Sequence, residues 1–221
     1  MAGLLVPMGG AIHGRGRDCM EAFCALAGRR VVVLPAASRR RNPLGWYEDP
    51  FAHFGVEVLL LPVWSVADAN DENHVRALRD AEAVFILGGA ETYLYDTLSG
   101  TGCEQALRQA HRDGAVVGGT SAGAMYLGQW VVEDMAHEKT EKGERATTPI
   151  AWLDRENAIY GGSGLAPRWV FDVHFSQRHR LPRLRKFSRR VPSAWCLGID
   201  EGTAAVVDGD RLVSVVGEGD V

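Results

Sequence analysis

A glycine-rich stretch in the middle of the chain holds a serine in a setting suited to nucleophilic chemistry. Residues 119–123 read Gly-Thr-Ser-Ala-Gly, with an apolar run before them and a helical pattern after them. A G-x-S-x-G pattern between a strand and a helix is typical of a nucleophile elbow, where bulky neighbours of Ser121 would clash with the backbone. The motif alone is weak because the chain has 26 glycines. A plain glycine-rich turn with an incidental serine is therefore the alternative.

Backbone amides near this serine are expected where an oxyanion would form. The N–H of Ala122 lies at the start of the helix that follows Ser121, where the helix dipole adds positive charge. A second glycine pair follows the apolar strand over 83–87. We expect the second donor to be Gly89, because an α/β hydrolase likewise draws its second donor from a separate strand-end loop. An ordinary strand-to-helix turn is the alternative for this pair.

A serine nucleophile needs a base. Of the seven histidines, His174 differs because it follows an apolar strand and begins a loop. We therefore expect it at the same edge of the sheet as Ser121, with His179 as its local rival. His74 and His111 lie on predicted helix faces beside charged residues, where we expect both to be exposed to solvent.

The base in turn needs an acceptor that orients it. Asp200 and Glu201 follow the apolar run at 196–199 and are expected at the same edge. One carboxylate would face the histidine and the other would cap or pair elsewhere. The chain order would be serine, histidine, acid. The α/β hydrolases have the order serine, acid, histidine, so this order argues against that fold.

The elements that must position these side chains are short apolar strands alternating with helices. This alternation predicts an α/β fold with a mostly parallel, doubly wound sheet, helices on both faces, and a site beyond the carboxyl ends of the strands. Two apolar runs flanking residues 208–210 predict a C-terminal β-hairpin. The helices are expected at 17–27, 71–81, 91–98 and 103–112, and the strands at 31–35, 56–62, 83–87, 115–119, 169–175 and 196–200.

Nothing in the sequence divides the chain. It has 221 residues without an internal repeat, a low-complexity tract or a linker, so we predict a single domain over 1–221. Residues 133–149 are charged and poor in apolar side chains, which predicts a solvent-exposed loop or flap. Whether that loop closes over the site is left open.

Composition excludes several classes of function. The formal net charge of −4 argues against nucleic-acid binding by bulk electrostatics. No apolar run has the length of a membrane span, and no signal peptide is expected because Pro7 interrupts the apolar start. Four cysteines without C-x-x-C spacing indicate free thiols in a reducing cytoplasm. We expect no metal, since the His-Glu pair at 137–138 lacks a second histidine at ligand spacing, and no cofactor.

Four blocks of the sequence together resemble the serine peptidase family that includes cyanophycinase and dipeptidase E (aspartyl dipeptidase). They occur in the family's order, cover most of the chain, and point in the last two blocks to the cyanophycinase branch. The resemblance implies a fold like the class I glutamine amidotransferase domain. The blocks are FILGGAETYLYDTL at 85–98, GGTSAGAM at 118–125, DVHFSQRHRLPRL at 172–184 and LGIDEGTAAVV at 197–207.

The resemblance also implies an activity and a set of roles. The activity is that of a serine-type exopeptidase acting next to aspartate. Carried over by motif position, Ser121 is the nucleophile, His174 the general base and Glu201 the orienting acid. Gly89 and Ala122 supply the oxyanion N–H groups.

The same comparison implies substrate contacts. Guanidinium groups suit the carboxylates of aspartate-linked substrates, whereas an aspartate could hold a substrate cation or position one of the arginines. Glu91 stands where cyanophycinases tend to have glutamine and favours a substrate amine or guanidinium; Val173 is a second departure from glutamine. Other basic residues over 178–190 are expected on a solvated helix face. The remaining candidates are Asp172, Arg178, Arg180 and Arg183.

Two substrates remain open within this family. One is the β-aspartyl-arginine linkage of cyanophycin, and the other is a small Asp-Xaa peptide. A homodimer is implied by the resemblance alone. The competing hypothesis from another class is a catalytically weak relative that binds a small ligand. An ammonia-channelling glutaminase is not expected, because no cysteine lies in an elbow.

Overall fold

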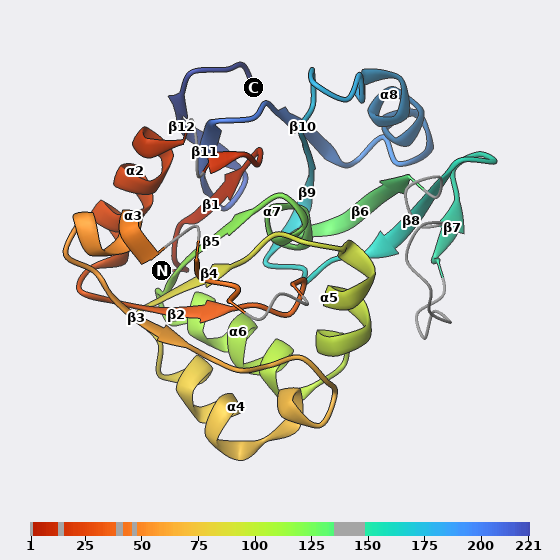
Figure 1. Ribbon diagram of the computed structural model, residues 1–221. Helices are drawn as coiled ribbons and strands as arrows, with labels where there is room; N and C mark the ends of the chain where they lie inside the picture. The colour runs from red at the N-terminus through yellow and green to blue at the C-terminus, as the bar shows by residue number, and fades with distance from the viewer. Residues whose placement is uncertain (1, 13–15, 39–41, 46–47, 135–148) are drawn as a thin grey trace.

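The α/β architecture expected from the sequence is present in the computed structural model, which describes residues 2–12, 16–38, 42–45, 48–134 and 149–221 (Figure 1). The helices are α2 (Arg17–Ala27), α3 (Glu48–His53), α4 (Glu72–Arg79), α5 (Glu91–Leu98), α6 (Gly102–Arg112), α7 (Ala122–Tyr126) and α8 (Leu181–Arg190), with a 3₁₀ turn at Asp68–Asn70. The strands are β1 (Leu5–Met8), β2 (Arg30–Leu34), β3 (Glu57–Leu60), β4 (Ala83–Ile86), β5 (Val116–Thr120), β6 (Gly128–Asp134), β7 (Ala151–Trp152), β8 (Asn157–Gly161), β9 (Ala166–Val173), β10 (Trp195–Ile199), β11 (Thr203–Asp208) and β12 (Arg211–Gly217).

A seven-stranded sheet has the order β12-β11-β1-β5-β4-β2-β3. Its five strands from β1 to β3 are parallel to their neighbours, whereas β11 runs antiparallel to β1 and pairs with β12 in the predicted C-terminal hairpin. The carboxyl ends of β1, β4 and β5 therefore meet at one edge of the sheet, which is where an α/β fold places its site.

Both faces of this sheet are buried, and the strands show why. Successive side chains point to opposite faces, so Val31 and Val33 pack with Phe23 of α2, while Val32 and Leu34 belong to the cluster on the other face. Helices α4, α5, α6 and α7 contribute to that second cluster. Apolar residues at every position are what a parallel sheet covered on both sides requires.

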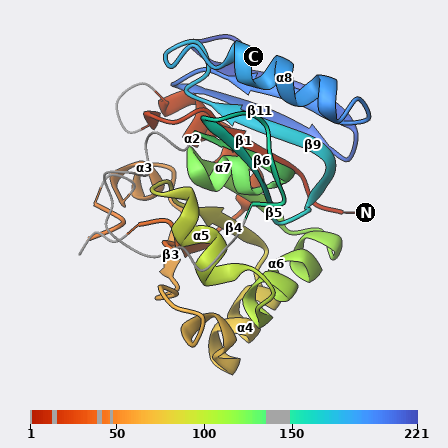
Figure 2. The ribbon, with the colours of Figure 1, turned by 90° about the vertical axis from the view of Figure 1, so that its right-hand side faces the viewer.

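The second half of the chain forms a separate five-stranded sheet, in the order β10-β9-β6-β8-β7. One face adds Val131, Tyr160 and Phe171 to the cluster shared with the first sheet, and α7 lies between the two sheets (Figure 2). The outer face packs against Leu184 and Phe187 of α8. The α/β class is thus confirmed, but the sequence reading did not predict that its strands divide into two sheets. The likeness to class I amidotransferase domains and the single domain stay predictions.

The charged segment predicted as a loop over 133–149 is only partly described. Glu133 and Asp134 are the last residues of β6, and Glu133 is buried, so the loop prediction is wrong for these two positions. Residues 135–148, including the His-Glu pair at 137–138, lie outside the described residues.

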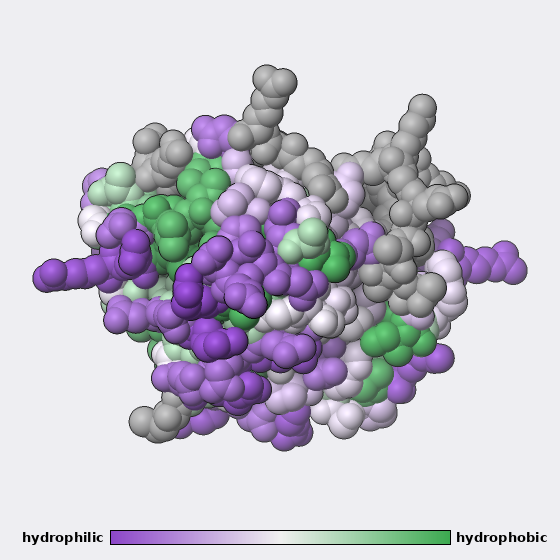
Figure 3. All heavy atoms as spheres, turned by 90° about the horizontal axis from the view of Figure 1, so that it is seen from below, coloured by the Kyte–Doolittle hydropathy of each residue, from purple (hydrophilic) through white to green (hydrophobic). Residues whose placement is uncertain are grey.

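The face of the molecule seen from below the view of Figure 1 is mostly hydrophilic and has separate apolar patches (Figure 3). Helix α4 itself is polar on its outer side because it reads Glu-Asn-His-Val-Arg-Ala-Leu-Arg, with only Leu78 buried. Within the described ranges, every helix is too short or too polar to cross a bilayer.

Candidate active site

Ser121 lies at the carboxyl end of β5, in the tight turn that begins α7. It is one of few non-glycine residues with a positive φ, at 53°, a conformation that costs energy and is frequent at functional sites. A Cβ on Gly119 would lie 2.6 Å from the backbone of Gly123, and one on Gly123 would lie 2.2 Å from the carbonyl oxygen of Ile86. The two glycines of the motif therefore make room for the turn, as the sequence predicts.

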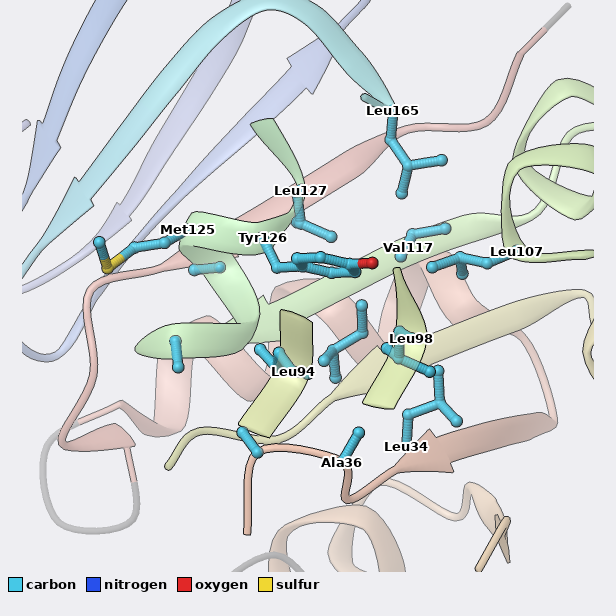
Figure 4. Close-up of a cluster of buried hydrophobic side chains, with 14 of the residues drawn as sticks. Leu34, Ala36, Leu94, Leu98, Leu107, Val117, Met125, Tyr126, Leu127 and Leu165 are labelled. Atoms are coloured by element: carbon cyan, nitrogen blue, oxygen red, sulfur yellow. The ribbon is translucent and has the colours of Figure 1, made fainter. Parts of the chain in front are cut away.

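The helix that follows the serine is a single short element anchored in the core. Tyr126 extends from α7 toward Val117 and Leu107 (Figure 4). Its hydroxyl donates a 2.8 Å hydrogen bond to buried Glu104 of α6. A buried apolar ring with a satisfied hydroxyl fixes the position of α7, and so fixes the turn before it.

His174 begins the loop after β9 and faces the serine. Its Nε2 lies 2.9 Å from Ser121 Oγ, and its Nδ1 lies 2.7 Å from Glu201 Oε1. When the ring proton is on Nδ1 and is donated to Glu201, Nε2 can accept the hydroxyl proton of Ser121. This chain of hydrogen bonds is the arrangement needed to activate a serine.

The electrostatic surroundings keep the His174 ring neutral. Burial lowers its pKa below the ordinary value of 6.5, and the positive charge of Arg178 lowers it further. The hydrogen bond to Glu201 opposes both effects but does not overcome them. A neutral imidazole is the form that can accept a proton.

The two consecutive carboxylates after β10 have different partners. Glu201 contacts the ring of His174, whereas Asp200 accepts a 2.8 Å hydrogen bond from the backbone N–H of Ser176. This division, with one carboxylate on the histidine and one capping elsewhere, is what the sequence predicts. Gln177 adds a contact that sequence reasoning missed, since its Oε1 accepts from the N–H of Glu201 at 3.1 Å.

The two expected oxyanion donors come from two segments near the serine, the start of α7 and the loop after β4. Ala122 is the first residue of α7, and a first-turn N–H has no acceptor within its own helix. The loop after β4 approaches the serine closely, because a Cβ on Gly88 would lie 3.0 Å from Ser121 Cβ. Its next residue, Gly89, has a φ of 156°, and a Cβ there would lie 2.0 Å from the carbonyl oxygen of Ala37.

Sequence reasoning missed the glycine pair after β1 as part of the site. The carbonyl oxygen of Gly9 accepts from the backbone N–H of His174 at 2.9 Å. Gly10 has a φ of 101°, and a Cβ there would lie 2.2 Å from His174 Cε1. The signal was present, because two glycines directly follow a buried strand whose carboxyl end lies at the site edge.

Three of the candidate substrate residues bind one another. Asp172 is 0% exposed, and both Arg180 and Arg183 donate hydrogen bonds to its carboxylate. The side chains of Arg180 and Arg183 are 6% and 7% exposed. Of the alternatives open for the aspartate, the structure favours positioning of arginines over direct contact with a substrate cation.

The other candidates differ in accessibility. Arg178 is exposed beside His174, and Glu91 is half-buried at the start of α5, within electrostatic range of Arg180. Val173 is fully buried in the core, so its side chain is not accessible for direct contact with a substrate.

The remaining histidines lie elsewhere in the fold. His179, the local rival of His174, is exposed. The expectation of a solvated His111 is wrong, because its ring is buried and its Nε2 lies 2.8 Å from the carbonyl oxygen of Gly3. Its counterpart His74 is half-buried, with Nδ1 2.9 Å from the carbonyl oxygen of Asp68. Among the described residues, no group of three or more His, Cys, Asp or Glu side chains is arranged to hold a metal ion.

Sequence comparison assigns the chain to a family. Residues 4–215 match the profile of peptidase family S51. A cyanophycinase of Synechococcus elongatus is 34% identical over 226 residues, which cover 99% of this chain and 67% of the relative. A cyanophycinase of Geminocystis herdmanii (strain PCC 6308) is 30% identical over 223 residues, covering 97% of this chain and 77% of the relative.

Two solved structures have a similar fold. A peptidase from an acI-B1 Actinobacterium superposes with a TM-score of 0.68 at 22% identity, covering 99% of this chain and 88% of that one. A Listeria monocytogenes EGD-e protein, described as a candidate peptidase E, gives a TM-score of 0.64 at 16% identity over 99% of this chain and 98% of that one. From its sequence match and its fold, the chain belongs to peptidase family S51 and is a serine peptidase.

Proposed function

We propose that this peptidase hydrolyses peptide or isopeptide bonds next to aspartate, in the manner of a cyanophycinase, through Ser121, His174 and Glu201. The observation that supports these roles best is the hydrogen-bonded chain from serine to histidine to glutamate, with distances of 2.9 and 2.7 Å. The two relatives described above, which match nearly the whole chain, are cyanophycinases.

The proposed chemistry is acyl transfer to water. Ser121 Oγ attacks the substrate carbonyl carbon while its proton passes to His174 Nε2, and the N–H groups of Gly89 and Ala122 stabilise the oxyanion. When the C–N bond breaks, Nε2 gives this proton to the leaving nitrogen. Water then attacks the ester, its proton passes to Nε2 and on to Oγ, and the product leaves with a free carboxylate.

Two accessible charges are proposed to select the substrate. Arg178 is exposed beside the base and suits a carboxylate of an aspartate residue. Glu91 follows the oxyanion loop, and its negative charge suits an amine or the guanidinium of a β-linked arginine. A β-aspartyl-arginine unit offers one group of each kind.

Hydrolysis assays on both substrates test the proposal. A β-aspartyl-arginine polymer and a panel of Asp-Xaa dipeptides would be incubated side by side with the wild type and with Ser121→Ala. Polymer cleavage that disappears in the variant is the expected result. Cleavage of the dipeptides alone would move the enzyme to the dipeptidase E type of activity, with Glu91 then facing the free amino group of the dipeptide.

Failure of both assays has a defined meaning. If folded wild-type protein cleaves neither substrate, the aspartate specificity is wrong. If Ser121→Ala retains wild-type activity on either substrate, the assigned nucleophile is wrong. Binding of a polymer or dipeptide without turnover would instead support a catalytically weak, ligand-binding relative.

A further inference from the structure

We propose that Asp172, Arg180 and Arg183 form a buried ion cluster that positions the general base, and that they act on catalysis through His174 and not by touching substrate. This inference rests on the proposed role of His174. It removes three residues from the set of candidate substrate contacts and gives them a different task.

Hydrogen bonds and opposite charges hold the cluster together. Arg183 holds Asp172 with both arms of its guanidinium, donating from Nε to Oδ2 at 2.8 Å and from Nη2 to Oδ1. Arg180 donates from Nη1 to the same Oδ1 at 3.1 Å. All three side chains are at least nine-tenths buried. A substrate carboxylate that bound to the same two donors of Arg183 would have to displace Asp172, and would leave that aspartate with fewer partners for its buried charge.

The cluster is directly connected to the backbone of the histidine. Asp172 lies two residues before His174 on β9, and Arg180 Nη1 also donates to the carbonyl oxygen of Val173 at 2.9 Å. That carbonyl belongs to the peptide bond that joins Val173 to His174. The cluster therefore fixes the peptide plane from which the base projects.

The backbone at this point needs such support. His174 has a φ of 47°, a left-handed conformation that costs free energy for a residue with a side chain. Backbone hydrogen bonds close the loop that follows, from the N–H of Arg178 to the carbonyl oxygen of His174 at 2.9 Å and from the N–H of Arg180 to that of Phe175 at 3.0 Å. This loop reverses the chain direction, so the side chain of Arg180 contacts the residue that precedes His174.

The cluster also contacts the nucleophile side. Arg180 Nη1 lies 4.0 Å from Sδ of Met125, which is in α7, the helix that begins at the serine elbow. Glu91 and Asp134 add negative charge that acts on Arg183 from α5 and β6. The buried guanidinium of Arg180 thus contacts both β9 and α7. The separation of these two elements sets the distance from Ser121 to His174.

Kinetics of Asp172→Asn and Arg183→Lys test this role. We expect Asp172→Asn to lower kcat by about 30- to 100-fold with KM changed by less than about 3-fold, because a small misplacement of the base affects the chemical step. Arg183→Lys keeps the positive charge but loses the paired N–H donors of the guanidinium, so the decrease in kcat should be smaller, roughly 3- to 10-fold. Asp210→Asn, which breaks the exposed ion pair with Arg168, is the matched control and should leave kcat unchanged.

A spectroscopic readout separates this inference from the proposed function. The proton that His174 Nδ1 shares with Glu201 would be followed by proton NMR and assigned by its loss in Glu201→Gln. In Asp172→Asn it should broaden or shift, whereas in Asp210→Asn it should not change. This readout needs no substrate, so a wild type without peptidase activity would refute the proposed function and leave the positioning role testable.

Three results would overturn the positioning role. A raised KM with unchanged kcat in both variants would make the cluster a substrate contact. A lower melting temperature with wild-type kcat would make it only structural. An unchanged His174 Nδ1 proton resonance in a folded variant would show that the cluster does not position the general base. If Asp172→Asn does not fold, Arg183→Lys decides by the same measurements, since it leaves no charge unpaired.

Discussion

The nucleophile and the general base of the candidate site are held in place by different kinds of interaction. Ser121 is held by backbone geometry, in a turn made possible by Gly119 and Gly123, whose added Cβ atoms would clash with neighbouring backbone. His174 is held by side-chain charge, through Glu201 on its ring and the Asp172 cluster behind its backbone. Both residues have a positive φ. The strained backbone is therefore stabilised by small neighbouring residues at Ser121 and by charged side chains at His174.

This difference predicts how each side responds to change. The turn around Ser121 depends on residues without side chains. Substitutions that add side-chain volume should therefore disrupt it, whereas changes of nearby charge should have little effect on it. A histidine fixed by buried ions should be damaged by the loss of charge or of hydrogen-bond geometry. The predictions that follow probe one side or the other.

The largest effect is expected on the nucleophile side. Ser121→Ala removes the attacking oxygen without altering the turn, so kcat on the cleaved substrate should fall by about 10⁴-fold or more. Affinity for the substrate should persist, because the candidate binding charges are untouched. Calorimetric binding with an unchanged melting temperature would check this, and activity within about 10-fold of the wild type would contradict the assignment.

The next largest effect is expected from the acid. Glu201→Gln keeps the shape of the side chain but removes the charge that stabilises the imidazolium, and its amide N–H can donate to Nδ1 of His174 and so select the wrong tautomer. We expect kcat to fall by about 10³- to 10⁴-fold. Asp200→Asn, on the neighbouring carboxylate that caps the N–H of Ser176, is the control. Equal losses in the two variants would mean that Glu201 has no special role.

A pure volume change tests the glycine side. Gly119→Ala places a Cβ 2.6 Å from the backbone of Gly123, so it should destabilise the fold by about 2 to 3 kcal/mol and reduce activity. Gly161→Ala is the control, because the nearest atom to its Cβ would be 3.6 Å away. Thermal unfolding compares the two variants. A Gly119→Ala enzyme with wild-type stability and activity would show that the turn does not depend on small residues.

The smallest effect is a shift in pH dependence on the base side. The His174 pKa lies below 6.5, and the neutral ring is the active form, so kcat/KM should fall only when the pH drops below that value. Arg178→Ala removes a positive charge that opposes protonation. The pKa should therefore rise, and the acid limb should move to higher pH by a few tenths of a unit.

The distant Arg189→Ala, on the exposed face of α8, should leave the pH profile unchanged. A downward shift in Arg178→Ala would contradict the sign of this electrostatic effect. A shift of equal size in both variants would show that it is not local to His174.

Much of the site could be predicted from sequence because it lies at strand ends. Ser121, His174 and Glu201 follow the largely apolar strands β5, β9 and β10, respectively. The expectation that they share the edge of a single sheet is wrong, because β5 belongs to the seven-stranded sheet whereas β9 and β10 belong to the five-stranded sheet. The apolar runs and turn glycines that mark those strands are local signals. They are therefore visible without knowledge of the tertiary structure.

What could not be predicted depends on contacts between distant segments. The pattern of β6 is only half apolar, and its partners β8 and β9 follow many residues later, so the second sheet has no local signature. The pairing of Asp172 with Arg180 and Arg183 could not be distinguished from substrate contacts, because spacing does not reveal burial. The space that Gly10 leaves for the His174 ring likewise depends on a contact between residues that follow β1 and β9, which are far apart in the sequence.

Covalent labelling tests the central claim most directly. The protein would be treated with an alkyl fluorophosphonate, which phosphonylates an activated serine, and the adduct located by peptide mapping. A single adduct on Ser121 that is lost in His174→Ala is the predicted result. An adduct on another residue, or no adduct on an enzyme that hydrolyses its substrate, would contradict the assignment of Ser121 and His174 as nucleophile and base.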